Sequence, residues 1–361
     1  MATDVRLATF NCENLFSRAK VLNLRSNEKT DEILKRIAVL QALLVRDAYS
    51  PADKKQILAL EKELSFYIEI TEYRGKLFVG RGEIRRVSAA GRHAWDGGIA
   101  FRRATFSEQQ RQNTALVIKK VAADVQCLVE IEDRPAIDAF NSQVLSRAFP
   151  YNMLIDGFDP RGIDVGLLTK RPILNVKTHI FDKDALGRIF SRDCLEVEVQ
   201  VRNGVSLHLL VNHFKSQGYG AAKDNDAKRQ RQAKAVARII QDRFDLSTNL
   251  VAVLGDFNDA PNRPPKALRP LLGLTGLSDV LELQFANSAD RWTYHYKSNE
   301  QIDYILVSDA LKAAFRTAGV ERRGMQDLTK ISTAGEVQFP SVSGPADAAS
   351  DHAAVWADFT L

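Results

Sequence analysis

The chain has 361 residues, of which 45% are hydrophobic and 26% are charged, ordinary values for a globular enzyme with a large core. Lys and Arg number 50 against 45 Asp and Glu, giving a formal net charge of +5, which favours an anionic partner such as a nucleic acid or a phosphate ester. No apolar run approaches the roughly 20 residues that a helix needs to span a bilayer, and we expect no membrane partner.

The three cysteines, Cys12, Cys127 and Cys194, sit in apolar, strand-like surroundings and form no CxxC pair. We therefore expect buried thiols and neither a disulfide framework nor a zinc site, which suits a reducing compartment. The N-terminus runs directly into a strand-like segment without a charged and then apolar leader. The expected location is cytoplasmic, although a secreted protein whose signal peptide had been removed would show the same pattern.

Strand-like segments recur along the chain, some alternating with period two and others continuously apolar, as at Val251–Leu254. The predicted strands are Arg6–Asn11, Val125–Glu130, Val165–Thr169, Leu195–Val201, Ser206–Asn212, Leu250–Leu254, Ile302–Val307 and Ala353–Asp358. Helices are predicted to end near Ala122 and to span Asp226–Arg243. The second carries a basic stripe that is either a solvated face or a nucleic-acid contact, made of Lys228, Arg229, Arg231, Lys234 and Arg238.

Residues 17–100 differ in pattern and are predicted to form an insertion after the first strand. Apolar residues at helical spacing follow Thr30 and Ser50-Pro51, which predicts a helical hairpin. A short β-like stretch at Lys76–Arg86 and a Gly-rich turn at 95–98 are expected next. Residues 326–350 are mostly small and polar and are predicted to form a long loop.

Polar side chains stand at the ends of six predicted strands. They are Asn11, Glu130, His213, the pair Asp256 and Asn258, Asp303, and the pair Asp351 and His352. A single Asp at a strand end is usually a turn former, but neighbouring strands gather their ends on one rim. We therefore expect these groups to converge on one cleft.

Carboxylates and an amide without cysteine are hard oxygen donors, which suit Mg²⁺ or Mn²⁺ rather than zinc. A metal beside two histidines suits hydrolysis of a phosphate ester, because the metal neutralises developing charge while an imidazole can accept a proton at neutral pH. The residues alone thus indicate metal-assisted phosphoester hydrolysis with the substrate left open.

These segments, in this order, resemble the endonuclease/exonuclease/phosphatase superfamily, which includes the pancreatic-type deoxyribonucleases and the abasic-site endonucleases. The matching pieces are "TFNCENLF", "ADVQCLVEIE", "GIDVGLLTKRPI", "FSRDCLEVEV", "VNHFKS", "VLGDFND", "QIDYILVS" and "SDH". The resemblance implies an α/β fold, a four-layer sandwich in which two mixed β-sheets pack face to face with helices outside. We expect a single catalytic domain over residues 1–361 that carries the 17–100 insertion.

The resemblance also implies metal ligands. Glu130 matches the principal ligand, and Asn11 and Asp351 are expected near the ion, Mg²⁺ or Mn²⁺. His352 corresponds to the residue that activates or orients the attacking water, with Asp303 polarising its ring.

Four further residues match positions that handle the water and the phosphate. Asp256 and Asn258 resemble a pair that positions water and a phosphate oxygen, and family mechanisms differ over whether that aspartate or the histidine takes the proton. His213 matches a phosphate or leaving-group contact. Arg192 matches a phosphate contact or forms a surface ion pair with Asp193, and Lys215 is a further candidate for phosphate.

The leading hypothesis is a metal-dependent phosphodiesterase that hydrolyses nucleic acid, DNA in preference to RNA, most simply as an endonuclease. The alternative is a phosphatase or phosphodiesterase for a small or lipid-linked phosphate ester, and a catalytically inactive binding protein is a third. The insertion could be a lid, a substrate-selecting wall or a dimer contact. The oligomeric state stays open.

Overall fold

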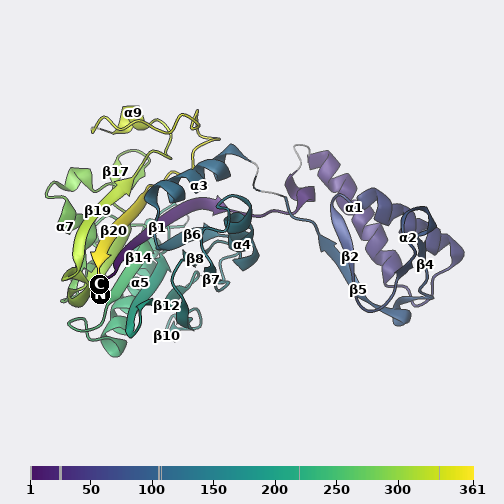
Figure 1. Ribbon diagram of the computed structural model, residues 1–361, viewed down its shortest axis with the longest axis horizontal. Coiled ribbons are helices and arrows are strands. Elements are labelled where there is room, and N and C mark those ends of the chain that lie inside the picture. Colours follow the sequence, from purple (N-terminus) through teal and green to yellow (C-terminus); the bar gives the residue numbers. More distant parts are fainter. Residues whose placement is uncertain (1, 24–26, 105, 107, 219, 333) are drawn as a thin grey trace. The chain divides into compact units, whose positions relative to one another are not determined.

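The computed structural model describes residues 2–23, 27–104, 106, 108–218, 220–332 and 334–361. The chain divides into two compact units (Figure 1). We call residues 1–16 with 106–361 the main unit, and residues 17–105 the inserted unit. The predicted insertion, residues 17–100, falls within the second of these.

The first sheet of the main unit has six strands, and its two central strands, β1 and β6, run parallel while the other pairs are antiparallel. Its strands, in spatial order, are β19 (Phe315–Glu321), β20 (Ala354–Thr360), β1 (Asp4–Leu15), β6 (Val125–Ile131), β8 (Asp164–Thr169) and β7 (Tyr151–Leu154).

The second sheet is also six-stranded and mixed, with β13 and β14 parallel and the remaining pairs antiparallel. Its strands, in spatial order, are β15 (Leu277–Asp279), β18 (Asp303–Ser308), β14 (Val251–Asp256), β13 (Val205–His213), β12 (Cys194–Arg202) and β9 (Ile173–Lys177).

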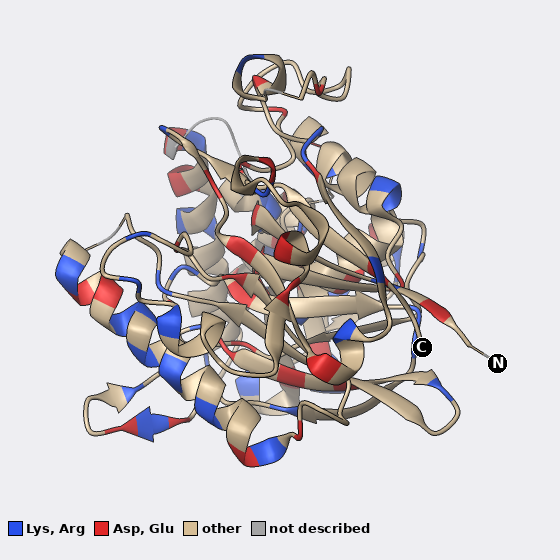
Figure 2. Cartoon of the chain, turned by 90° about the vertical axis from the view of Figure 1, so that its left-hand side faces the viewer, with Lys and Arg blue, Asp and Glu red and all other residues tan. Residues whose placement is uncertain are grey.

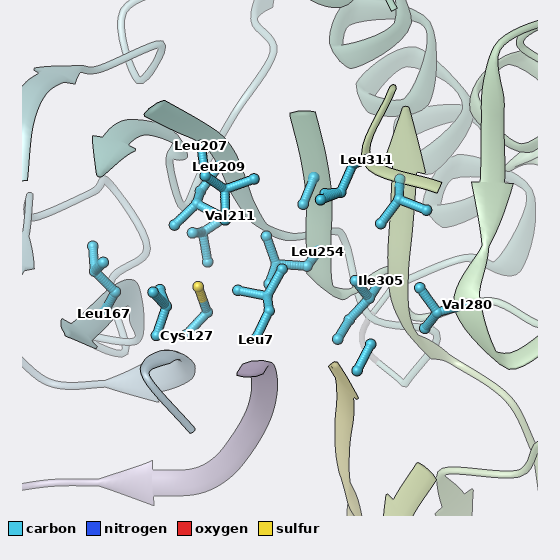
Figure 3. Packing of buried hydrophobic residues seen from close by; sticks show 14 of the residues in the cluster. Leu7, Cys127, Leu167, Leu207, Leu209, Val211, Leu254, Val280, Ile305 and Leu311 are labelled. Carbon is cyan, nitrogen blue, oxygen red and sulfur yellow. The ribbon is translucent and has the colours of Figure 1, made fainter. Parts of the chain in front are cut away.

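The two sheets pack face to face through one apolar layer (Figure 3). Leu7 and Cys127 of the first sheet share this layer with Leu209, Leu254 and Ile305 of the second, all fully buried. Because successive side chains of a strand point to opposite faces, the residues between them face outward onto helices. The predicted pair of mixed sheets in a four-layer α/β sandwich is thereby confirmed.

Helices cover both outer faces. The helices α3 (Gln109–Val121) and α4 (Arg134–Gln143) bury Ile118 and Phe140 against the first sheet. The long helix α5 (Ala222–Arg243) buries Val236 and Ile240 against the second. Sequence patterns had indicated α3 and α5 but not α4, which is short and begins after the Asp133 N-cap.

The remaining elements of the main unit are short. They are the strand pairs β10 (Lys183–Asp184) with β11 (Gly187–Arg188) and β16 (Tyr294–His295) with β17 (Asn299–Glu300), and the helices α6 (Arg269–Leu272), α7 (Val280–Gln284), η4 (Ser288–Asp290), α8 (Asp309–Lys312) and α9 (Leu328–Ile331). The helix α9 lies within the predicted loop at 326–350. All three cysteines are buried free thiols, as predicted.

The inserted unit has its own apolar core, which includes Leu40, Ile57 and Trp95. Its elements are η1 (Lys20–Asn23), α1 (Asn27–Leu44), α2 (Pro51–Leu64), β2 (Ile68–Gly75), β3 (Phe78–Val79), η2 (Gly82–Ile84), β4 (Arg86–Val87), η3 (Arg92–Ala94) and β5 (Trp95–Phe101). Ser50 and Asp53 form a reciprocal capping box at the start of α2.

Two local predictions were wrong. Residues 95–98 form the beginning of strand β5 rather than a turn, because they pair antiparallel with β2. Asn11 lies inside β1, not at its end, because the strand continues through Leu15. Across the described parts of the chain, none of the helices is both long enough and apolar enough to cross a membrane.

Candidate active site

Strand register brings three of the predicted site residues side by side at the strand ends that form one rim of the second sheet. His213 is paired with Asp256 across the parallel strands β13 and β14, and Asp256 is paired with Asp303 across β14 and β18. Gly255 permits the close pairing: its φ is +130°, and a Cβ there would lie 1.9 Å from the carbonyl oxygen of Asn212.

Each of these three residues is followed by a buried aromatic ring on the opposite face of the sheet. Phe214, Phe257 and Tyr304 form a continuous stack with centroid separations of 4.9 and 4.9 Å. The Tyr304 hydroxyl donates to the carbonyl oxygen of Asp259 at 2.8 Å. We call these three rings the aromatic stack; it fixes the spacing of the strand ends above it.

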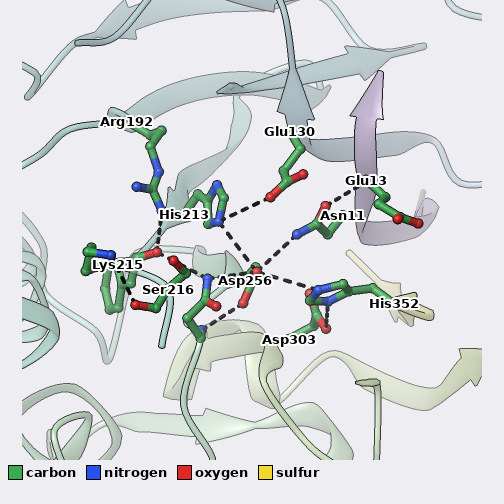
Figure 4. A network of polar contacts seen from close by, with 12 residues as sticks. Asn11, Glu13, Glu130, Arg192, His213, Lys215, Ser216, Asp256, Asp303 and His352 are labelled. Atoms are coloured by element: carbon green, nitrogen blue, oxygen red, sulfur yellow. Dashed lines mark hydrogen bonds and ion pairs between the residues drawn. The ribbon is translucent and has the colours of Figure 1, made fainter. Parts of the chain in front are cut away.

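His352 and Asp303 form a buried pair (Figure 4). The Nδ1 atom of His352 lies 2.9 Å from Oδ2 of Asp303, and the hydroxyl of Thr293 donates to the same oxygen at 2.7 Å. Burial alone would lower the pKa of His352, but the carboxylates of Asp303, Asp351 and Asp256 raise it well above its ordinary value. The ring therefore favours its protonated form.

Asp256 occupies the centre of the polar network. Its carboxylate accepts hydrogen bonds from the Asn258 backbone at 2.7 Å, the Asn258 side chain at 2.9 Å and the Asn11 side chain at 3.1 Å. Asn258 has a φ of +55°, which turns the chain back toward the aspartate. Burial, opposed by His352 and assisted by Asp303, raises the pKa of Asp256 to about 7.

Glu130 and His213 lie on the other side of Asp256. His213 Nε2 is 3.6 Å from Asp256 Oδ2 and 3.9 Å from Glu130 Oε1. Burial, followed by the charge of Arg192, lowers the pKa of His213 well below its ordinary value, so this imidazole is neutral. The two histidines of the site therefore differ in charge.

Arg192 is buried and does not pair with Asp193, so the predicted alternative of a surface ion pair was wrong. Its guanidinium donates to Asp159 at 3.1 Å and to the carbonyl oxygen of Phe214 at 2.5 Å. Asp193 instead accepts from the backbone of His179. Lys215 lies near Arg192 in Figure 4, and burial lowers its pKa.

The donor set at Glu130 fits a hard divalent ion. Glu130 has a φ of +64°, burial raises the pKa of its carboxyl group, and no group among the described residues donates a hydrogen bond to it. Glu130 is half-buried, and a carboxylate that is partly removed from water without donors is stabilised when a cation pairs with it. Asn11 supplies an amide oxygen nearby, and Asp351 an additional carboxylate.

A second group could also hold an ion. One ligating atom each of Asp256, Asp303 and His352 lies within 4.8 Å of the others. However, His352 Nδ1 and Asp303 Oδ2 are already joined to each other, so an ion there would have to compete with that hydrogen bond. The Glu130 side, whose carboxylate has no such competing bond, fits an ion better.

Three residues that were not among the predicted site residues contact members of the site. Glu13 accepts from the backbone of Asp351 at 3.1 Å, and burial together with Asp351 raises its pKa to about 7. Asp159 holds Arg192, and Thr293 holds Asp303. Strand alternation in the sequence indicates that Glu13 faces the same way as Asn11, two residues before it, whereas Asp159 and Thr293 carry no local signal.

The sandwich and its polar edge define a phosphoester hydrolase, and the comparisons with known proteins agree. The sequence profile of the Endonuclease/Exonuclease/phosphatase family matches residues 97–315. The chain belongs to this family, whose enzymes generally use divalent metal ions. No curated protein matches the sequence.

Solved structures show the same fold at low identity. The endonuclease/exonuclease/phosphatase from Beutenbergia cavernae is 18% identical, with a TM-score of 0.50 over 70% of this chain and 66% of that one. D. rerio TDP2 complexed with single strand DNA product is 17% identical, with a TM-score of 0.49 over 70% and 92%. Beta toxin from Staphylococcus aureus is 19% identical, with a TM-score of 0.48 over 69% and 92%. At these identities the likeness concerns the fold alone.

Proposed function

We propose that the protein is a Mg²⁺- or Mn²⁺-dependent phosphodiesterase that hydrolyses nucleic acid, DNA in preference to RNA, by cutting within the strand. The observation that carries the proposal is the buried His352–Asp303 pair at 2.9 Å, set beside Asp256 on an edge that also holds Arg192. The cationic side chains of His352 and Arg192, together with Asp256 as a potential base, thus surround the place where a phosphodiester would bind.

Glu130 and Asp351, with the amide oxygen of Asn11, would hold the metal ion. When bound, such an ion neutralises charge on the phosphate and on the leaving oxygen. Glu13 supports this arrangement by accepting the backbone N–H of Asp351.

The chain's own groups divide the remaining tasks by their charge. Asp256, whose pKa lies near neutrality, is suited to take the proton from the attacking water. Protonated His352 and Arg192 are suited to stabilise the negative oxygens of the phosphate. Neutral His213 is suited to orient the phosphate by a hydrogen bond. The Asn258 amide donates to Asp256 and to the Phe214 carbonyl oxygen and so positions the aspartate, and Lys215 adds positive charge at the margin of the phosphate.

Nicking of supercoiled plasmid DNA with Mg²⁺, Mn²⁺ or EDTA tests the proposal. We expect cleavage that requires metal, that is lost in His352→Ala and that persists in His93→Ala, a control in an exposed histidine that contacts the Asp47 carbonyl. An intact plasmid together with hydrolysis of small or lipid-linked phosphate esters would instead establish the alternative substrate class.

A further inference from the structure

The positive charge of the chain resides in the inserted unit. Residues 17–105 contain 18 Lys and Arg against 11 Asp and Glu, a net charge of +7. The main unit contains the other 32 Lys and Arg against 34 Asp and Glu, a net charge of −2. The excess that favours an anionic partner is therefore a property of the unit that lacks the catalytic residues.

Within the inserted unit, the charge is concentrated in one segment. Residues 74–86, which we call the basic hairpin, contain five Lys and Arg and one Glu. They include the strand β3, the turn after it and Arg86, the first residue of the antiparallel strand β4. A net charge of +4 over 13 residues exceeds half of the excess of the whole unit.

Specific contacts hold the basic hairpin in shape. The carboxylate of Glu72 accepts the backbone N–H groups of Leu77 and Phe78 at 2.9 and 3.0 Å. Arg85 lies over the Phe78 ring at 4.2 Å and pairs with Glu61 of α2 at 2.9 Å. These contacts hold the basic hairpin to its own unit and use only a minority of the charged side chains of the hairpin.

Three arginines of the basic hairpin are left for a partner. Arg74, Arg81 and Arg86 are exposed, and none has a side-chain partner among the residues that the structure describes. Two apolar side chains accompany them at high exposure, Tyr73 at 79% and Ile84 at 73%. Arginine beside an exposed aromatic ring is the combination that binds a nucleic-acid strand, the guanidinium on phosphate and the ring on an unpaired base.

The predicted basic stripe on α5 does not offer the same opportunity. Figure 2 shows basic residues along this helix, but most are engaged. Arg229 is buried and pairs with Asp226, Arg231 pairs with Asp184, and Lys228 donates to Ser191. Side chains that are already paired or hydrogen-bonded within the chain are less available to bind a polyanion.

We propose that the basic hairpin is a binding surface for single-stranded nucleic acid, through which the inserted unit holds substrate for the main unit. The proposal rests on the proposed nuclease function. The chain leaves the main unit after Phe16, one residue beyond the end of β1 at Leu15. It returns to the main unit at Phe106, before α3 begins. Since β1 also carries Asn11, covalent linkage raises the local concentration of substrate for the site.

The test compares two triple variants of the full chain. Arg74→Ser, Arg81→Ser and Arg86→Ser together remove charge from the basic hairpin, whereas Lys120→Ser, Lys177→Ser and Lys312→Ser remove the same charge from exposed positions of the main unit. Anisotropy of a labelled single-stranded DNA oligonucleotide in EDTA reports binding without turnover. Hydrolysis of bis(p-nitrophenyl) phosphate with Mn²⁺ reports the chemistry without the hairpin.

We expect the hairpin variant to bind the oligonucleotide about tenfold or more weakly and to lose about 2 from the slope of log K against log salt, since each phosphate contact on a single strand contributes about 0.7. The lysine control keeps both values, and all three proteins hydrolyse the small ester alike. Tyr73→Ser should weaken single-strand binding and leave binding to duplex DNA unchanged.

Equal oligonucleotide binding by the two triple variants would overturn the inference while leaving nuclease activity possible. Loss of binding to phosphatidylserine vesicles, with oligonucleotide binding intact, would also overturn it and identify a membrane surface. Failure of the wild-type protein to cleave any nucleic acid, despite turnover of the small ester, would instead count against the nuclease function.

Discussion

The main unit and the inserted unit differ in whether their charged side chains are buried. The main unit buries Arg192, His213, Asp256, Asp303 and His352 along one edge of its sheets. In the inserted unit, Asp53 is the one charged side chain that is buried among the described residues, and there it caps α2 and pairs with Arg46. Because burying charge is unfavourable, a fold retains it chiefly where the charge is paired or used. The contrast therefore matches the proposed division, in which the main unit performs the chemistry and the inserted unit presents charge to a partner.

Replacing the metal-side carboxylate should give the largest effect. Glu130→Gln keeps shape but removes the charge, and we expect phosphodiester hydrolysis to fall by about 10² or more, because even supporting groups around a metal contribute 10- to 100-fold. Calorimetric titration with Mn²⁺ should show weaker binding. Glu198→Gln on β12 is the control; equal activity of the two variants would contradict the assignment.

Disrupting the acid–imidazole pair should have the next largest effect. In Asp303→Asn the first of the three carboxylates that raise the pKa of His352 is lost, so this pKa should fall and the ring should lose its proton at lower pH. The maximal rate should drop about 10²-fold or more. NMR titration of His352 measures the shift, with Asp290→Asn as the exposed control; an unchanged titration would show that Asp303 does not set the charge of the ring.

A pair of core substitutions tests whether the two units are independent. Leu40 and Leu209 are both fully buried, in the inserted and main cores respectively. Each Leu→Ala change should cost about 2–5 kcal/mol. Leu40→Ala should lower a melting transition of the inserted unit and spare hydrolysis of a small ester, whereas Leu209→Ala should impair that hydrolysis on warming. Loss of small-ester hydrolysis on warming in both would mean that the units unfold together.

A smaller effect should follow from buried charge away from the site. Burial raises the pKa of Asp279 to about 7, although Leu281 N and Gln301 donate to it. Its stabilising contribution is therefore complete below the ordinary pKa and is lost as pH rises through 7.

Asp279→Asn should consequently gain stability relative to wild type between pH 4 and 8, by at least about 1 kcal/mol, since one pKa unit corresponds to about 1.36 kcal/mol. Urea unfolding at several pH values measures the difference. Asp309→Asn, which is exposed, should show no such trend, and a flat difference for Asp279→Asn would remove the basis for the claim.

The sequence predicted the strand-end residues of the site because strand endings carry a strong local signal. His213, Asp256 and Asp303 end or begin apolar strands whose register then aligns them. The positive φ of Glu130, by contrast, depends on the shift in pairing of β6 with its neighbours, which no single segment reveals.

Contacts between segments that are far apart in the sequence could not be predicted, for the same reason. Asp159 and Arg192 are 33 residues apart, and their pairing follows from the packing of loops rather than from either motif. The strand β5 was missed because Gly97 and Gly98 are typical of turns, and only pairing with β2 makes them extended. Local patterns thus gave the groups of the site, and tertiary packing decided how they are oriented.

The aromatic stack has a consequence for the breathing motions of the protein. Phe214, Phe257 and Tyr304 are fully buried, and each belongs to or directly follows a different central strand. Opening any one of them would expose apolar surface on all three, so local fluctuation there is suppressed. The backbone amides of Phe214 and Phe257 should therefore exchange with deuterium only when the whole main unit unfolds. The candidate active site would then stay assembled until that global unfolding.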